Sequence, residues 1–168
     1  MTNKSFNSSI DLMNYVYHRA YKLSKVLNCK EIPIYCVIAK FDKRSNSYKV
    51  IVESSNKIET DNCSIKHAEI VCILEIFKLK SIRFLDEYDI FVSLEPCMMC
   101  ASTISYARLK SIHFYEFNNE GGFYSSKNPL FLTQKHLFRP KIIIHKVQKS
   151  KSYKCQNIIK IFFKKIRG

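Results

Sequence analysis

The sequence predicts an α/β fold, a three-layer α/β/α sandwich around a five-stranded mixed sheet. Segments with the helical spacing of apolar residues alternate along the chain with short, continuously apolar segments. With 168 residues, the chain is long enough for one domain with a single core, so we expect residues 1–168 to form one domain. Hydrophobic residues make up 46% of the sequence, a composition typical of globular proteins and not of disordered ones.

Apolar periodicity and turn residues place the individual elements. The expected elements are, in chain order, a helix from Ser8 or Ser9 to about Asn28, strands at 32–41 and 48–53, a helix at about 66–80, a strand at 88–94, a helix at 97–107, strands at 111–117 and 141–147, and a helix at 153–166. A polar turn at 42–46 joins the first two strands, which predicts a hairpin. The later strands alternate with helices and complete the mixed sheet.

Positive charge is concentrated at the C-terminal end of the chain. The net charge is +14, and residues 121–168 contain 12 of the 28 Lys and Arg residues but none of the 14 acidic ones. The remaining 120 residues therefore carry only +2, from 16 basic and 14 acidic side chains. Biased base composition explains lysine in place of arginine, but not 48 positions without an acid. The asymmetry favours an anionic partner, with nucleic acid as the first candidate, over a merely solvated surface.

The cysteines and the N-terminus predict a cytoplasmic protein without disulfides. The cysteine count is odd, at seven, and no apolar signal segment follows Met1. No apolar run approaches the length of a membrane span, so we expect no membrane association. Cys36 and Cys72 lie among apolar residues and are most simply small core residues.

Two short motifs carry the chemistry of the chain. The first is His67-Ala68-Glu69, and the second, which follows thirty residues later, is P-C-M-M-C at 96–100. Together they offer one imidazole and two thiols, which suit zinc, with a carboxylate two residues from the imidazole. The pattern H-x-E…P-C-x-x-C is that of zinc nucleobase deaminases, in which the glutamate moves protons and the metal activates water.

The spacing of these residues fits a catalytic zinc site. Cys97 and Cys100 are three residues apart, so both sulfurs face one side of a helix. They stand at the start of that helix, where exposed amides and the helix dipole stabilise thiolates. Three protein ligands, His67 with the two cysteines, leave a fourth position for water, as catalytic zinc sites do. Glu69 is then the expected general acid and base.

Each motif also has a simpler interpretation. A lone C-x-x-C is also found in redox pairs and in half of a structural zinc knuckle, and a single histidine is more often an ordinary one. A knuckle needs a second ligand pair, and the sequence contains no second C-x-x-C and no H-x-x-x-H. The conjunction of H-A-E on one helix with P-C-x-x-C opening another favours the catalytic site.

The motifs resemble those of the cytidine deaminase superfamily and, within it, bacterial tRNA-specific adenosine deaminases. H-A-E-I at 67–70 and S-L-E-P-C-M-M-C-A at 93–101 carry the resemblance, which extends over about residues 10–166. It implies a cytidine deaminase-like fold, one Zn²⁺ per chain and a homodimer. It also implies conversion of the wobble adenosine of a tRNA anticodon stem-loop to inosine.

The resemblance also implies roles for residues outside the ligand set. Asn56 lies eleven residues before His67, where the family places an asparagine that hydrogen-bonds the target purine. The backbone amides around Ala68 and Cys97 are expected to orient the water and the leaving group. The family's terminal helix lies near the tRNA, and the residues expected to contact phosphates there are Lys164, Lys165 and Arg167.

Two departures from the family pattern bear on the substrate. Tyr35-Cys36 stand where the family has Gly-Ala beside the base, which predicts a smaller or rearranged pocket. Phe117-Asn118 stand where the family has an Arg-Asp pair. A neutral amide would then replace a carboxylate able to address a ribose hydroxyl. Because the 2′-hydroxyl distinguishes RNA from DNA, we hypothesise weaker discrimination between the two.

The leading prediction is therefore a zinc-dependent hydrolase that deaminates adenosine in tRNA. One alternative is a deaminase of a free nucleobase or nucleoside, such as guanine or cytosine, for which the basic region would be incidental. Another is a non-catalytic, zinc-containing subunit that binds nucleic acid. Glu69 speaks against that last alternative, because a structural metal site has no use for it.

Overall fold

A computed structural model describes residues 4–26, 30–119, 121–125, 129–145, 158–160 and 162–164. Its helices and strands are, in order, β1 (Ser5–Phe6), α1 (Ser9–Lys25), β2 (Tyr35–Asp42), β3 (Ser47–Ser55), α2 (Ala68–Leu79), β4 (Tyr88–Leu94), α3 (Met98–Tyr106), β5 (Ser111–Glu116), α4 (Leu130–Thr133) and β6 (Lys141–Ile144). Most expected elements are thus present, with ends shifted by a few residues. In the described part of the chain, no helix combines the length and apolarity that crossing a bilayer requires.

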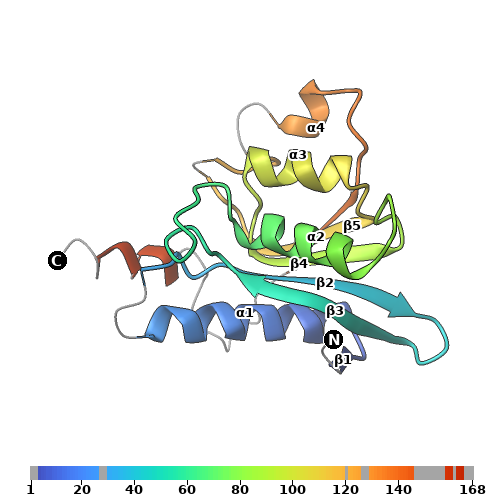
Figure 1. The fold of residues 1–168 in the computed structure, drawn as a ribbon, viewed down its shortest axis with the longest axis horizontal. Coiled ribbons are helices and arrows are strands. Elements are labelled where there is room, and N and C mark those ends of the chain that lie inside the picture. Colours follow the sequence, from blue (N-terminus) through green and yellow to red (C-terminus); the bar gives the residue numbers. More distant parts are fainter. Residues whose placement is uncertain are drawn as a thin grey trace.

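The strands form one mixed sheet between two layers of helices, as predicted. Their order is β1-β3-β2-β4-β5-β6, with β4, β5 and β6 parallel and the other pairings antiparallel. Helix α1 covers one face, and α2 and α3 cover the other (Figure 1). The predicted strand number was wrong, because six strands are described. The additional strand β1 pairs only two residues with β3, too few to show a periodic pattern.

Helix α1 has a local start signal and one buried face. The Ser8 side chain accepts a hydrogen bond from the backbone N–H of Asp11, at 3.1 Å, and so caps the first turn. Leu12, Val16 and Ala20 are fully buried at four-residue spacing, as a helix packed on a sheet requires. This packing covers the sheet face opposite the two chemical motifs.

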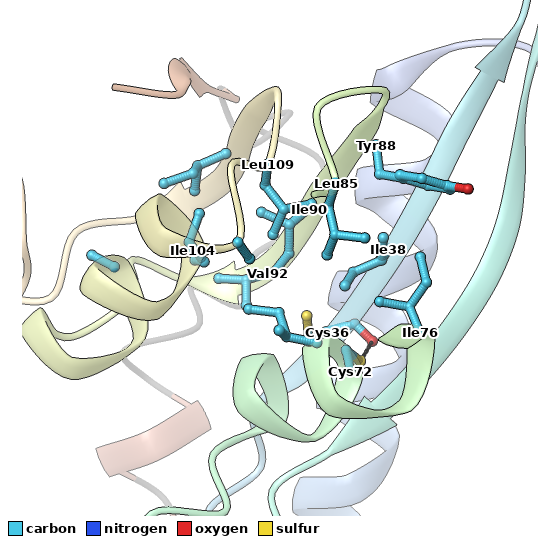
Figure 2. Packing of buried hydrophobic residues seen from close by; sticks show 14 of the residues in the cluster. Cys36, Ile38, Cys72, Ile76, Leu85, Tyr88, Ile90, Val92, Ile104 and Leu109 are labelled. Carbon is cyan, nitrogen blue, oxygen red and sulfur yellow. Dashed lines mark hydrogen bonds between the residues drawn. The ribbon is translucent and has the colours of Figure 1, made fainter. Parts of the chain in front are cut away.

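The second face carries the larger core, into which α2 and α3 pack. Figure 2 shows this cluster, in which side chains of β2 and β4 meet those of both helices. Cys72 and Ile76 of α2 are buried against Cys36 and Ile38 of β2, and the Cys72 thiol lies 3.5 Å from the Cys36 carbonyl oxygen. Cys36 and Cys72 are therefore small core residues, as expected. Packing against the sheet holds the starts of α2 and α3 in place.

The C-terminal part departs from expectation in two ways. The short helix α4 was not predicted, because one helical turn gives no periodic signal. Of the basic helix expected at 153–166, only 158–160 and 162–164 are described, and these residues are helical. Ile158 and Phe162 are buried there, and Ile158 joins the core beside α1.

Candidate metal and active site

Both chemical motifs lie at the N-termini of neighbouring helices. His67 is the residue that precedes α2, and Cys97 is the residue that precedes α3. Both have extended backbone conformations, with ψ of 153° and 171°, from which the chain turns into the helix. Strand β4 ends three residues before Cys97, and Pro96 separates the two elements. The strand end and the two helix starts therefore meet at one place.

The three predicted ligands converge there. The ligand atoms of His67, Cys97 and Cys100 all lie within 4.8 Å of one another, and His67 Nδ1 is 3.8 Å from Cys97 Sγ. Cys100 is fully buried, whereas His67 and Cys97 are half-buried. A group of this kind, with one imidazole and two sulfurs around a common centre, can hold a metal ion.

The ionisation of the two thiols shows that this donor set fits a metal. Contacts with the Cys100 thiol and with His67 lower the pKa of Cys97 to about 4. The pKa of Cys100 is raised, because a second thiolate would lie against the first in a buried site. A divalent cation between the sulfurs removes that repulsion and allows both to ionise. The chemistry of the donors thus favours metal binding over a free dithiol.

Glu69 is the buried acid of the site. Only 3% of its surface is exposed, and no hydrogen-bond partner is described for Oε2. Burial raises the pKa of Glu69 to about 7, the Cys97 thiolate opposes its ionisation, and His67 favours it. A buried carboxylate oxygen without a partner is rare, because it carries a desolvation cost. Glu69 is therefore placed as a proton carrier needs to be, next to the ligands but outside the ligand set.

Asn56 and Ala68 are joined to each other. The carboxamide oxygen of Asn56 accepts a hydrogen bond from the Ala68 backbone N–H, at 2.9 Å. Asn56 lies just after β3 and is 2% exposed, so its side chain is held at the start of α2. With its oxygen engaged, the group that Asn56 can offer a substrate is its NH₂ donor. The Ala68 amide, expected to orient water, is bonded to Asn56 here.

The structure separates Tyr35 from the metal-binding residues. Tyr35 packs in the cluster beside α1, where the guanidinium carbon of Arg19 lies 4.9 Å from the centre of its ring. Cys36 faces α2 and lies near Glu69 and Cys100. Among the described residues, the metal-binding group includes neither Cys36 nor Cys63. The ring of Tyr35 thus lies on the α1 face of the sheet. It takes up no space on the α2 face, where the candidate ligands lie.

The chain is similar in sequence to known deaminases over most of its length. Residues 11–167 match the MafB19-like deaminases. The chain belongs to that family. It is 37% identical over 138 residues to the tRNA-specific adenosine deaminase of Rickettsia typhi, a match that covers 82% of this chain and 88% of the relative. The resemblance to tRNA-specific adenosine deaminases is thereby confirmed.

Solved structures of deaminases share the fold. One, from work on A-to-I editing by tRNA:A34 deaminases at the wobble position of transfer RNA, is 25% identical, with a TM-score of 0.73 over 89% of this chain and 99% of that one. A guanine deaminase from Nitrosomonas europaea has a TM-score of 0.69 but only 13% identity, over 96% of this chain and 89% of that one. The second likeness shows the fold alone. The cytidine deaminase-like fold is confirmed.

Sequence reasoning missed the role of Glu95 in this deaminase. The residue lies two positions before Cys97 and is 2% exposed. Its carboxylate accepts hydrogen bonds from the backbone N–H groups of Asn118, Tyr124 and Ser125, at 2.7–2.8 Å, and from the Ser125 hydroxyl, at 2.5 Å. Glu95 thereby fastens the segment after β5 to the metal-binding motif. Its position within L-E-P-C was visible in the sequence, but its distant partners were not.

The expected nucleic-acid contacts are only partly described. Lys164 is exposed in the described C-terminal helical residues, and Lys165 and Arg167 lie outside the described part of the deaminase. The Asn118 carboxamide oxygen accepts a hydrogen bond from the Gly121 N–H, at 3.3 Å, and so stabilises its own turn. The hypothesis about RNA and DNA discrimination stays a prediction.

Proposed function

We propose that this deaminase is a zinc-dependent aminohydrolase that converts adenosine to inosine at the wobble position of a tRNA anticodon. The observation that carries the proposal is the convergence of His67, Cys97 and Cys100 on one centre, with the buried Glu69 beside it. The similarity to tRNA-specific adenosine deaminases over most of the chain supports this substrate.

Zinc is the metal that these ligands fit best. Two thiolates and a neutral imidazole give a formally neutral site and are soft enough to exclude magnesium and calcium, which prefer oxygen ligands. When bound, zinc lowers the pKa of water and so supplies a nucleophile at neutral pH. The protein holds the three ligands in place through the starts of α2 and α3.

Glu69 moves the protons of the reaction. A water oxygen bonds to the purine carbon that bears the exocyclic amine, the carbon–nitrogen bond breaks, and ammonia leaves. Glu69 accepts a proton from the water, delivers it to a ring nitrogen, and then carries the next one to the departing amine. Its raised pKa, near 7, suits a group that must both accept and release protons at neutral pH. Asn56, held by its bond to Ala68, donates from its NH₂ group to the purine.

The tRNA contacts come from the basic C-terminal region. Residues 121–168 carry +12, and we assign the phosphate contacts there to Lys164, Lys165 and Arg167. We further propose a homodimer, as the family resemblance implies. We also propose a cytoplasmic location, in keeping with a tRNA substrate.

The decisive experiment is inosine formation by the zinc-loaded protein. The substrates are an anticodon stem-loop RNA with adenosine at the wobble position, the same hairpin in DNA, and free guanine, cytosine and cytidine. We expect inosine from the RNA and no ammonia from the free compounds. Ammonia from a free base would instead establish the first alternative. Absence of turnover on every substrate, with zinc bound, would favour a binding subunit.

The phosphate contacts are tested by charge reversal. Lys164→Glu should weaken binding of the stem-loop and lower the slope of log affinity against log salt concentration by about 1 to 2, the effect of losing one contact and adding a repulsive charge. Lys43→Glu is the matched control, because Lys43 is exposed in the turn between β2 and β3. Equal effects of the two substitutions would contradict the assignment.

A further inference from the structure

Two aromatic rings are exposed side by side close to the metal-binding residues. The rings of Phe117 and Tyr124 lie within 16° of parallel, with centroids 6.4 Å apart. Their exposed fractions are 37% and 45%, so both side chains are partly open to solvent. Together the two rings offer flat apolar faces on which a ligand can stack.

The pair is joined to the metal-binding motif through the backbone. Gly122 forms a β-bridge with Cys97, and the Phe123 N–H donates to the Pro96 carbonyl oxygen, at 3.1 Å. Tyr124 is therefore two residues beyond the residue that pairs with a metal ligand, a separation of roughly 7 Å along the chain. Phe117 stands on the fully buried Phe114, which belongs to the core shared by α2 and α3.

Glu95 fixes the orientation of this pair. Its carboxylate binds the backbone N–H of Tyr124 and that of Asn118, the residue after Phe117. One buried side chain thus binds the backbone beside both aromatic residues and ties it to the end of β4, which precedes Cys97. A Cβ atom at position 122 would collide with the Glu95 carboxylate, so glycine allows this close approach. The backbone that carries the rings is thus held in place, which lowers the ordering cost when a ligand binds there.

We propose that Phe117 and Tyr124 form a stacking platform for one unpaired base of the RNA loop, next to the base that reacts. This inference rests on the proposed function and adds the group that receives a neighbouring base. To react, a base must leave the stack of the loop, and its neighbours then expose flat faces. Proteins capture such unstacked bases on aromatic rings.

The chemistry of the surface favours a base over an apolar protein partner. The segment 121–168, to which Tyr124 belongs, has an excess of twelve positive charges, which attracts a polyanion. The metal-binding residues lie on the same side of the sheet, so a bound loop would pass both. A protein partner that covers the rings, including a second copy of this chain, is the competing occupant and forms one outcome of the test below.

The test compares substitutions that remove the ring with one that keeps it. Tyr124→Leu and Phe117→Leu keep apolar bulk without a π-face, Tyr124→Phe keeps the ring, and Tyr106→Leu changes an exposed tyrosine at the far end of α3. Stem-loop RNA is offered to each zinc-loaded variant, intact or with one abasic nucleotide in the loop. Zinc content, kcat and KM are measured for every pair, together with the mass of each variant in solution.

We expect both leucine variants to raise KM roughly 5- to 100-fold, the range that base stacking spans, with kcat and zinc content close to wild type. Tyr124→Phe and Tyr106→Leu should retain the wild-type KM. One abasic position should raise the KM of the wild type and cost nothing further in Tyr124→Leu, because the same contact is already lost.

Three results would overturn the inference. The first is an unchanged KM in both leucine variants. If the wild type still deaminates the RNA, this result removes the stacking platform but leaves the proposed function intact. The second is a fall in mass of the leucine variants, from oligomer to monomer, without the abasic coupling, which assigns the rings to a protein interface. The third is a wild type that neither binds nor deaminates RNA, which removes the proposed function itself.

Discussion

Replacing Glu69 with glutamine removes the carboxylate beside the three candidate ligands while keeping the size and shape of the side chain. The side chain is 3% exposed and lies in the first turn of α2, where glutamine fills the same space, so the fold and the three candidate ligands should remain. General acid–base catalysis by a placed side chain typically contributes 10²- to 10⁴-fold to the rate. The other ionisable groups of the site, His67, Cys97 and Cys100, would have their lone pairs on the metal and cannot replace it. We therefore expect a loss near the upper limit, about 5 kcal/mol of activation free energy.

The assay is single-turnover inosine formation on the anticodon stem-loop, with zinc content and RNA affinity measured on the same preparations. Glu75→Gln is the matched control, because Glu75 lies on the same helix and is exposed. The control should keep wild-type turnover, whereas Glu69→Gln should keep zinc and RNA binding and lose turnover. Activity of Glu69→Gln within tenfold of wild type would refute the role of Glu69 as proton carrier.

Three further predictions concern the metal, the loop and the pH dependence. Cys100→Ala should lower zinc content from about one per chain to below a tenth, measured by atomic emission, because it removes a buried ligand. Glu95→Gln should raise KM for the stem-loop more than it lowers kcat, with zinc retained, because an amide cannot accept all four bonds; a fall in kcat alone would contradict this. Burial lowers the pKa of His113 from 6.5 to about 3, so the unfolded chain binds a proton first as the pH falls. The free energy of unfolding is therefore highest above pH 6.5 and falls below that pH, by about 2 kcal/mol at pH 5. Urea unfolding should show a smaller loss between these pH values for His113→Gln than for the control His18→Gln, because His18 is exposed.

Much of the candidate metal site could be predicted, because the residues within each of its two motifs are close in sequence and follow local rules. Cys97 and Cys100 share one helix face at three-residue spacing, whichever fold surrounds them. His67 and Glu69 likewise lie within one helical turn. The long strands and helices were also predictable, since apolar periodicity extends over several turns or alternations in each. Elements shorter than that, β1 and α4, were not.

The structure corrected expectations wherever the direction of a side chain mattered. Leu74 of α2 is apolar but 51% exposed, whereas Cys72 and Ile76 of the same helix face the core. Tyr35 was expected beside the base, but it lies on the α1 face. A shift of one residue turns a side chain to the other face of a strand and by about 100° around a helix, so motif alignment alone does not decide which neighbour points inward.

By itself, the sequence indicated the proposed reaction chemistry, because the candidate ligands and the proposed proton carrier are defined by side-chain types and their local spacing. Only the tertiary structure decided how distant segments meet: Asn56 with Ala68, Glu95 with Tyr124 and Ser125, and Gly122 with Cys97. These contacts span 12 to 30 positions, and no local periodicity encodes them. They form because packing of the sheet against α2 and α3 brings the strand ends and loops together, and a buried carboxylate must then find its donors there.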